Sequence, residues 1–201
     1  LESTRKFYET NEELIHDIAN AYREVIKQFY EAGCRNLQLD DCTWGAVVGD
    51  AAKLRYKALG IDLDTVKSQL LEVNNLALEG KPEDLVITSH ICRGNYNSTY
   101  FSSGAYDSVA DYVFARENVD ALLLEYDDER SGSFEALAKV SPDKKVVLGL
   151  ITTKSPKLED KEAVIARIKE ASKYVPLERL CLSPQCGFAS CEIGNKLTEE
   201  E

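Results

Sequence analysis

Apolar positions along the chain follow two different spacings, one typical of amphipathic helices and the other of buried strands. Where apolar side chains recur every three or four residues, as in residues 11–30, the pattern predicts a helix with one apolar face. Short apolar runs bounded by polar loops predict strands that are covered on both faces. The expected helices cover residues 11–30, 62–79, 106–117, 133–139 and 159–174, and the expected strands cover residues 36–40, 85–90, 121–125, 146–150 and 180–183.

Helices and strands alternate along the chain, and this order favours an α/β fold with a parallel sheet. Thr10 and Glu13 have the spacing of a capping box and mark the start of the first helix, and Gly33 marks its end. Residues 41–61 are expected to form a loop before the next helical pattern, because Trp44 is followed closely by two glycines, Gly45 and Gly49.

The composition is that of a globular protein and excludes several classes of partner. The 201 residues carry a formal net charge of -11 and no basic stripe, which argues against a nucleic-acid or anionic-membrane surface. No apolar run approaches the ~18 residues of a membrane span. The first residues also lack the basic and apolar segments of a signal peptide, so we expect a cytoplasmic location.

The six cysteines could form three disulfides, but a chain of this size does not need disulfides for stability. Cys34, Cys92 and Cys181 lie in or beside apolar runs, where we expect buried free thiols. We interpret the thiols as reduced, which is consistent with a cytoplasmic location and leaves cysteines available as metal ligands. The six are Cys34, Cys42, Cys92, Cys181, Cys186 and Cys191.

Polar residues gather where the expected strands end. Asp40 ends the first strand, His90 the second and Glu125 the third, while Cys186 follows the fifth. The carboxyl ends of parallel strands meet at one edge of the sheet, which is where such folds bind their ligands. We therefore expect these side chains to share one site.

His90 and Cys92 are two residues apart in an extended segment, so their side chains point to the same side. Together with Glu125 and Cys186 they offer one imidazole, one carboxylate and two thiols, which form a plausible zinc set. Each residue also has an ordinary alternative at this stage. A histidine or cysteine can pack in a core, and Glu125 can pair with a nearby arginine.

Four separated motifs, in order, resemble the cobalamin-independent methionine synthase family and in particular its short, single-barrel bacterial members. The resemblance covers nearly the whole chain. It implies a (β/α)8 barrel, a catalytic zinc ion (Zn2+) and transfer of a methyl group to the thiol of homocysteine. The motifs are LQLDD (37–41), HICRGN (90–95), LEYDDERSG (124–132) and LSPQCGFAS (182–190).

The resemblance also assigns roles to individual residues. The family's acidic residue that holds the amino group of homocysteine falls on Asp40. Lys154 occupies the position of a histidine that donates a proton in the folate-using enzymes, and the folate-contacting acid falls on Ala46. These two differences leave the methyl donor open among folate, a corrinoid and other activated methyl compounds. The implied zinc ligands are His90, Cys92, Glu125 and Cys186.

A complete (β/α)8 barrel needs about 250 residues, and this chain shows only five strands. By the family pattern these are the last five, so we expect residues 1–201 to be the C-terminal portion of one barrel domain without its first three strands and final helix. An open sheet exposes edges that a closed barrel lacks. We therefore expect self-association through these edges.

Several assignments have two readings at this stage. Trp44 either lines the pocket or packs in the core, and Lys154 is either a proton donor or a solvated loop charge. Arg93 and Arg130 either meet a substrate carboxylate or pair with acids such as Glu125. The function also has alternatives: the same zinc chemistry on a different thiol, or a structural zinc module or inactive barrel fragment without turnover.

Overall fold

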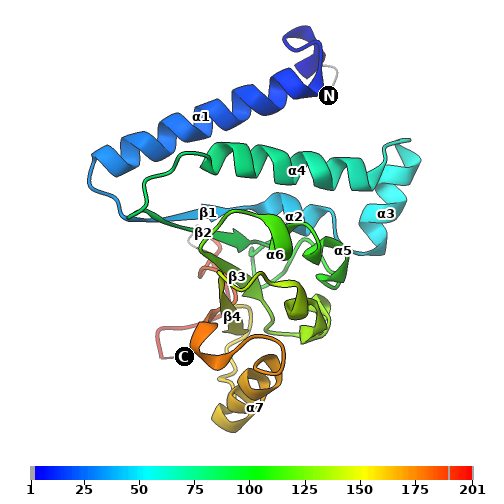
Figure 1. Cartoon of the computed structure of the whole chain (residues 1–201). Helices are drawn as coiled ribbons and strands as arrows, with labels where there is room; N and C mark the ends of the chain where they lie inside the picture. The colour runs from blue at the N-terminus through cyan, green and yellow to red at the C-terminus, as the bar shows by residue number, and fades with distance from the viewer. Residues whose placement is uncertain (1–2, 190, 201) are drawn as a thin grey trace.

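A computed structural model describes residues 3–189 and 191–200 and shows an α/β fold (Figure 1). Five parallel strands form one sheet in the order β1-β2-β3-β4-β5, so that every strand pairs with its neighbours in sequence. All five predicted strands are confirmed, with ends that differ by at most one residue. The strands are β1 (Asn36–Asp40), β2 (Val86–Ile91), β3 (Ala121–Glu125), β4 (Lys145–Ile151) and β5 (Leu180–Pro184).

Helices lie between consecutive strands, as the alternating pattern predicts. The predicted capping box is present at the start of the first helix, where the Glu13 backbone N–H donates to Thr10 Oγ1 over 3.1 Å. The α-helices are α1 (Asn11–Glu31), α2 (Cys42–Ala46), α3 (Gly49–Ala58), α4 (Leu63–Leu78), α5 (Asp107–Ala110), α6 (Val113–Arg116) and α7 (Lys161–Ala171). The 3-10 helices are η1 (Thr4–Lys6), η2 (Glu129–Ser131), η3 (Phe134–Lys139) and η4 (Leu177–Arg179).

The outer face of the sheet forms the core of the molecule. Ile91, Leu124 and Leu148 pair across β2, β3 and β4, and each is at most 1% exposed beneath the helices. An aromatic cluster fills the space between the sheet and η3, with Tyr126 and Phe134 ring centroids 4.7 Å apart. Burial of this apolar face is the main contribution to the stability of the fold.

The same row of residues ends at Leu182 on β5, which is 48% exposed because no helix in the described ranges follows that strand. Cys181 lies on the opposite, inner face of this edge strand and is also exposed. The prediction that Cys181 is buried is therefore wrong, since the described residues leave its face of β5 uncovered. Cys34 is only partly buried, and Cys92 is buried as expected.

The predicted helix over residues 106–117 is broken into α5 and α6, which corrects the sequence-based expectation. The side chain of Arg116 explains the break, because its Nε donates to the backbone carbonyl of Asp111 over 2.8 Å. A carbonyl satisfied in this way is free to leave the helical pattern. The break places Tyr112 against Trp44, with their ring centroids 6.5 Å apart.

The expected loop over residues 41–61 instead contains α2 and α3. Asp41 caps α2 by accepting a hydrogen bond from the Thr43 backbone N–H over 2.8 Å. Gly45 is inside this helix for reasons of space: a Cβ atom there would lie 2.4 Å from the Cys92 carbonyl oxygen. Glycine is thus required for close packing. The prediction of a loop was wrong because glycine usually disfavours a helix, whereas here packing requires it inside one.

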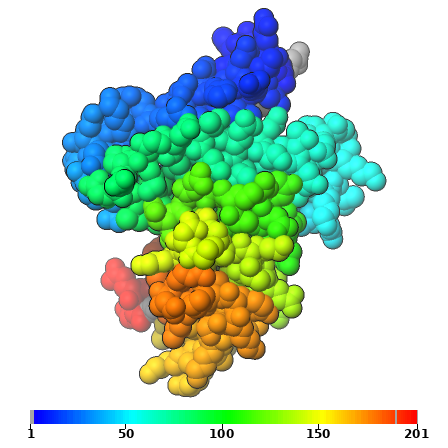
Figure 2. All heavy atoms as spheres, in the orientation of Figure 1, coloured from blue at the N-terminus to red at the C-terminus, as the bar shows by residue number. Residues whose placement is uncertain are grey.

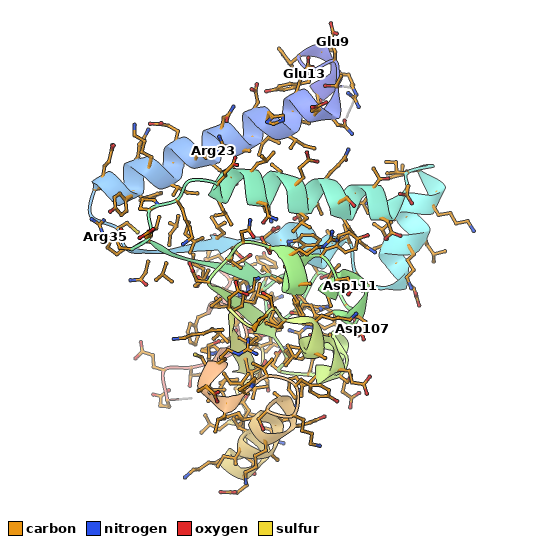
Figure 3. All side chains as sticks on the ribbon, in the orientation of Figure 1. Glu9, Glu13, Arg23, Arg35, Asp107 and Asp111 are labelled. Atoms are coloured by element: carbon orange, nitrogen blue, oxygen red, sulfur yellow. The ribbon has the colours of Figure 1, made fainter. Side chains whose placement is uncertain are left out.

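Helices α1 and α4 lie side by side beyond one edge of the sheet (Figure 1). Arg23 points from α1 towards α4 (Figure 3) and donates to the Leu76 carbonyl over 2.7 Å. The outer surface of α1 stands at the periphery of the molecule (Figure 2). In the described ranges, no helix is long and apolar enough to cross a membrane.

Candidate metal centre at the carboxyl edge of the sheet

The four predicted ligands come together in space, although they are spread over almost a hundred residues. One nitrogen, one oxygen and two sulfur atoms, one from each residue, lie within 4.8 Å of one another. His90 comes from β2 and Glu125 from the end of β3, while Cys92 and Cys186 follow β2 and β5. The expectation that strand ends gather these side chains into one site is confirmed for these four.

The spacing of the donor atoms fits a single zinc ion. With zinc–sulfur bonds of about 2.3 Å, two thiolates on a tetrahedral ion lie about 3.8 Å apart; the Cys92 and Cys186 sulfurs are 3.9 Å apart. A nitrogen and an oxygen on such an ion lie about 3.4 Å apart. His90 Nε2 and Glu125 Oε1 are 3.6 Å apart. The donor types and their separations therefore suit zinc.

His90 gives a second reason to expect that a cation binds at this point. Its imidazole is 95% buried, since the residue is only 5% exposed, yet Nε2 has no hydrogen-bond partner among the described residues. A buried polar atom without a partner costs free energy unless something satisfies it. A metal ion is a natural partner for an imidazole nitrogen that faces a carboxylate and two sulfurs.

Close packing of backbone holds these donors in place. In β4, a Cβ atom on Gly149 would lie 2.6 Å from the Gln185 Cα and 2.8 Å from the Leu124 carbonyl oxygen. Only glycine therefore lets the segment after β5 approach β4 closely enough to place Cys186. On the other side, the backbone N–H of Arg93 donates to Glu125 Oε1 over 2.9 Å and fixes that carboxylate.

Glu125 is fully buried and is surrounded by donors and positive charge. Its Oε2 accepts a hydrogen bond from Arg130 over 2.7 Å and lies 3.9 Å from Lys154 Nζ. Burial by itself raises the pKa of Glu125, but the neighbouring His90 imidazole and the hydrogen bonds from the Arg93 backbone and Arg130 outweigh it and leave the pKa lowered. The carboxylate is therefore ionised at neutral pH and available as a ligand.

Arg130 pairs with acids, as the simpler sequence interpretation stated. Besides Glu125, it binds Asp127 over 2.7 Å and also contacts Asp128. Burial alone lowers the pKa of Arg130, yet the charge of Asp127 and the bonds to Glu125 and Asp127 raise it above the usual arginine value. Arg93 points elsewhere and donates to the Gly104 carbonyl over 2.6 Å.

The imidazole of His90 and the thiol of Cys186 have strongly shifted pKa values. Burial lowers the pKa of His90, but the neighbouring Cys186 and Glu125 raise it to about 9. The neighbouring Cys92 and burial both raise the pKa of the Cys186 thiol. Clustered ligands of this kind repel one another when ionised, which is the situation that a bound cation relieves.

The other predicted site residues occupy different environments. Asp40 lies at the same edge, with Oδ1 4.0 Å from His90 Nε2 and its side chain 62% exposed, so it is accessible from solvent. Lys154 is not a solvated loop charge, because its side chain is only 8% exposed and faces Glu125. Trp44 is completely buried against Tyr112, which matches the alternative of core packing.

A further thiol, Cys42, lies beside the cluster and was not among the predicted ligands. Its sulfur lies within 4.8 Å of both the Cys92 sulfur and an Asp40 oxygen. Its position two residues after Asp40 was the available hint, but the expectation of a loop over residues 41–61 gave no direction to its side chain.

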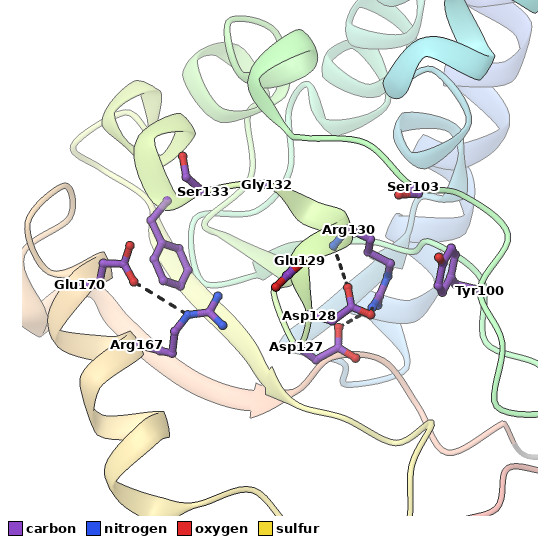
Figure 4. Close-up of a pocket in the computed structure, with 11 residues that line it drawn as sticks. Tyr100, Ser103, Asp127, Asp128, Glu129, Arg130, Gly132, Ser133, Arg167 and Glu170 are labelled. Carbon is purple, nitrogen blue, oxygen red and sulfur yellow. Dashed lines mark hydrogen bonds and ion pairs between the residues drawn. The ribbon is translucent and has the colours of Figure 1, made fainter.

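A cavity of about 880 Å³ is lined in part by Arg130 (Figure 4), whose guanidinium also contacts Glu125 of the cluster. The acids that pair with Arg130 line one wall, and Arg167 with Glu170 of α7 lines another, with Arg167 Nε 4.0 Å from Glu170 Oε2. Arg130 is thus shared between the Glu125 carboxylate and a space large enough for a small organic molecule.

Comparison with known proteins identifies relatives over nearly the whole chain. Residues 5–198 match the family model described as the catalytic domain of cobalamin-independent synthase. The uncharacterized protein YxjH of Bacillus subtilis (strain 168) is 51% identical over 195 residues, which cover 96% of this chain and 52% of that protein. A methionine synthase of Saccharolobus solfataricus is 26% identical over 186 residues, covering 92% of this chain and 47% of the relative. The chain thus spans about half the length of the curated relatives it matches.

Two solved structures share the fold. A candidate vitamin-B12-independent methionine synthase from Listeria monocytogenes superposes with a TM-score of 0.73 at 41% identity, covering 92% of this chain and 52% of that one. A B12-independent methionine synthase from Shewanella sp. W3-18-1, in complex with selenomethionine, superposes with a TM-score of 0.66 at 22% identity. The match covers 92% of this chain and 51% of that one. The second likeness concerns the fold alone, and the two together confirm an α/β fold of the (β/α)8-barrel type. The chain therefore belongs to the cobalamin-independent synthase family, and it matches the catalytic domain of that family.

Proposed function

We propose that residues 1–201 form the C-terminal portion of a zinc-dependent methyltransferase domain that methylates a thiol, with homocysteine as acceptor and methionine as product. The observation that carries the proposal is the spacing of the four donor atoms, which suits one Zn2+ ion beside the exposed carboxylate of Asp40. Membership of the family supports methyl transfer as the kind of reaction. The proposed ligands are His90, Cys92, Glu125 and Cys186.

A zinc ion held there would lower the pKa of a substrate thiol, so that the thiolate is present as a nucleophile at neutral pH. Asp40 would bind the ammonium group of the amino acid and orient its thiol towards the cluster. Its exposure and its 4.0 Å distance from His90 support this role. Orientation of this kind contributes to the rate because it replaces a chance encounter by a fixed geometry.

Lys154 is the proposed proton donor to the departing methyl carrier. Its Nζ is buried without a hydrogen-bond partner among the described residues and lies 3.9 Å from Glu125 Oε2. A cation in this position can donate a proton to an atom that approaches the cluster. The methyl donor itself stays open among folate, a corrinoid and other activated methyl compounds, and Trp44 is proposed to shape the pocket only from within the core.

The state of the cysteines supports a reducing, cytoplasmic location for this chemistry. All six are free thiols, and the zinc ligands among them must stay reduced to bind metal. The acidic charge and the absence of a basic stripe in the sequence support small molecules, rather than nucleic acid or membrane, as partners.

The first test is the zinc content of the purified 201-residue chain, measured by elemental analysis beside two cysteine variants. We expect about one zinc ion per chain in the wild type and in Cys34→Ser. Cys34 lies before β1, at the amino ends of the strands, whereas the cluster lies at their carboxyl ends. We expect the zinc to be lost in Cys186→Ser. Circular dichroism shows whether each variant is folded.

Folded wild-type protein without zinc would overturn the proposed metal centre. If zinc is present, calorimetric titration with homocysteine then separates an enzyme from a structural zinc module. A catalytic site should bind the thiol in the zinc-loaded protein and lose that binding in Asp40→Asn, whereas a structural site should bind no thiol in either form.

A further inference from the structure

A third thiol, that of Cys42, lies beside the two thiols of the proposed metal position. Cys42 is the first residue of α2 and is exposed, while Cys92 beside it is buried. The Cys42 sulfur, the Cys92 sulfur and an Asp40 oxygen all lie within 4.8 Å of one another.

The capping and the packing of α2 fix the position of Cys42. The Asp41 carboxylate caps α2 and so sets where the helix begins. Gly45, one turn further along, allows the helix to approach the Cys92 carbonyl, where any Cβ atom would lie only 2.4 Å away. With both the start and the packing of α2 fixed, its first side chain is directed at the edge of the sheet that carries the cluster.

The surroundings of Cys42 also call for a cation. His90 is 95% buried and directs a partnerless Nε2 into the same cluster, with Asp40 Oδ1 at 4.0 Å. Glu125, by contrast, already accepts hydrogen bonds at both oxygens, from the Arg93 backbone and from Arg130. These bonds compete with a metal for the carboxylate. A nearby thiolate is a softer donor that zinc prefers.

We propose that Cys42 is a third thiolate ligand, which binds the metal in the absence of substrate at the position that the substrate thiol later takes. The inference rests on the proposed function, because it needs a metal in the cluster. The Cys42 sulfur would have to move by up to about 1 Å, from within 4.8 Å of the Cys92 sulfur to the about 3.8 Å that separates two thiolates on one zinc ion, and the residue is exposed.

The exchange needs no outside reagent. When a substrate thiol arrives, Cys42 gives up its bond to the metal, the substrate sulfur forms one, and the proton of the substrate thiol passes to the Cys42 sulfur. The number of bonds to the metal and the total charge are unchanged, and nothing is oxidised or reduced. Cys42 would thus keep the open position closed to other ligands until a thiol displaces it.

The test is the absorption spectrum of the 201-residue chain loaded with Co2+ in place of zinc, because each thiolate bound to cobalt adds charge-transfer intensity in the near ultraviolet. We expect the intensity of three thiolates in the wild type and in the control Cys34→Ser, and of two in Cys42→Ser. Addition of homocysteine should raise the charge-transfer intensity of Cys42→Ser from that of two thiolates to that of three, and should leave the wild type at the intensity of three.

Equal intensity in the wild type and Cys42→Ser would overturn the third ligand while leaving the metal centre intact. Failure of folded wild-type protein to bind cobalt would overturn the proposed function and this inference together. Alkylation gives a second measurement that does not need the variant. Iodoacetamide should label Cys42 in the metal-free chain and spare it in the zinc-loaded chain, and equal labelling in both states would contradict the proposal.

Discussion

At the scale of single residues, Arg130 holds together the acidic surroundings of the proposed metal centre. Its side chain is 3% exposed and pairs with Glu125 and Asp127, whose side chains are 0% and 2% exposed. Carboxylates in such a place depend on their partner, because a buried charge without compensation is costly. A surface ion pair such as Lys139 with Asp111 contributes far less, since water solvates both groups.

We therefore expect Arg130→Met to lower the free energy of unfolding by about 3–5 kcal/mol, the usual cost of removing one partner of a buried pair. Lys139→Met, which breaks a pair whose side chains are 56% and 66% exposed, should cost less than about 1 kcal/mol. Urea unfolding of both variants measures the difference. Equal, small losses would show that Glu125 and Asp127 do not depend on Arg130.

Glu117 is a second buried acid, and it lies away from the metal cluster. The residue is completely buried and accepts a hydrogen bond from Asn74 over 2.8 Å, while the same amide donates to Asp41 over 2.7 Å. Burial, and then the charge of Asp41, raise the pKa of Glu117 from 4.5 to about 8. The group is thus protonated in the folded protein at neutral pH.

This shift predicts how stability changes with pH. Because Glu117 binds a proton more tightly when folded than when unfolded, the stability it supports falls as the pH rises from 4.5 to about 8 and levels off above that. Each unit of the shift is equivalent to about 1.4 kcal/mol. We expect Glu117→Gln, which stays neutral, to lose less stability than the wild type between those two pH values.

Denaturant unfolding at both pH values measures this effect. The exposed Glu83→Gln serves as the control, because it removes the same charge without burial and should follow the wild type. If the wild type and Glu117→Gln lose stability in parallel, Glu117 is ionised in the folded protein and the raised pKa is refuted.

At the scale of elements, the strands were predictable from local pattern and the finer packing was not. Strands β2 to β5 are visible in the sequence as apolar runs, and Asp40, His90 and Glu125 mark the ends of β1, β2 and β3. The break at Asp111 depends on a hydrogen bond from Arg116, which no periodicity reveals. The burial of Lys154 likewise depends on how the loop after β4 folds against Glu125.

The same distinction applies to the site. The four proposed ligands could be predicted to lie together because strand order brings strand ends together, and the family resemblance named the same residues. The position of Cys42 could not be predicted, because the direction of its side chain depends on α2. Gly45 in this helix suggests a loop in the sequence, but in the fold it allows close packing. Sequence patterns thus predict which elements meet, while close contacts decide which side chains face the site.

Gly149 tests the role of close packing directly. A methyl group there would lie 2.6 Å from the Gln185 Cα, so the segment that carries Cys186 has to move. We expect Gly149→Ala to cost about 1–3 kcal/mol of stability, as overpacking usually does, and to lower the zinc content. Gly187→Ala is the matched control, because its Cβ would meet nothing within 4 Å. Full zinc occupancy in Gly149→Ala would contradict the packing argument.

At the scale of the whole molecule, two of the apolar surfaces that the described residues leave exposed bear on association, one on α1 and one on the edge strand β5. The apolar face predicted for α1 is only partly buried: Ile15, Ala19 and Ile26 are in the core, while a second row is 39–51% exposed. That row consists of Ile18, Tyr22, Val25 and Phe29. The other surface is Leu182 on the edge strand β5, whose neighbours in the same row are buried. Both surfaces favour association.

We expect the chain to associate with itself in a concentration-dependent way, because burial of these surfaces removes apolar area from water. Val25→Glu should weaken the association by placing a charge in the exposed row of α1. Leu54→Glu is the matched control: Leu54 is 69% exposed on α3, outside both surfaces, so the same change should have no effect. Sedimentation velocity over a range of concentrations measures the outcome. A chain that stays monomeric throughout, or that associates equally well with Glu at either position, would show that the α1 row does not drive contact between copies.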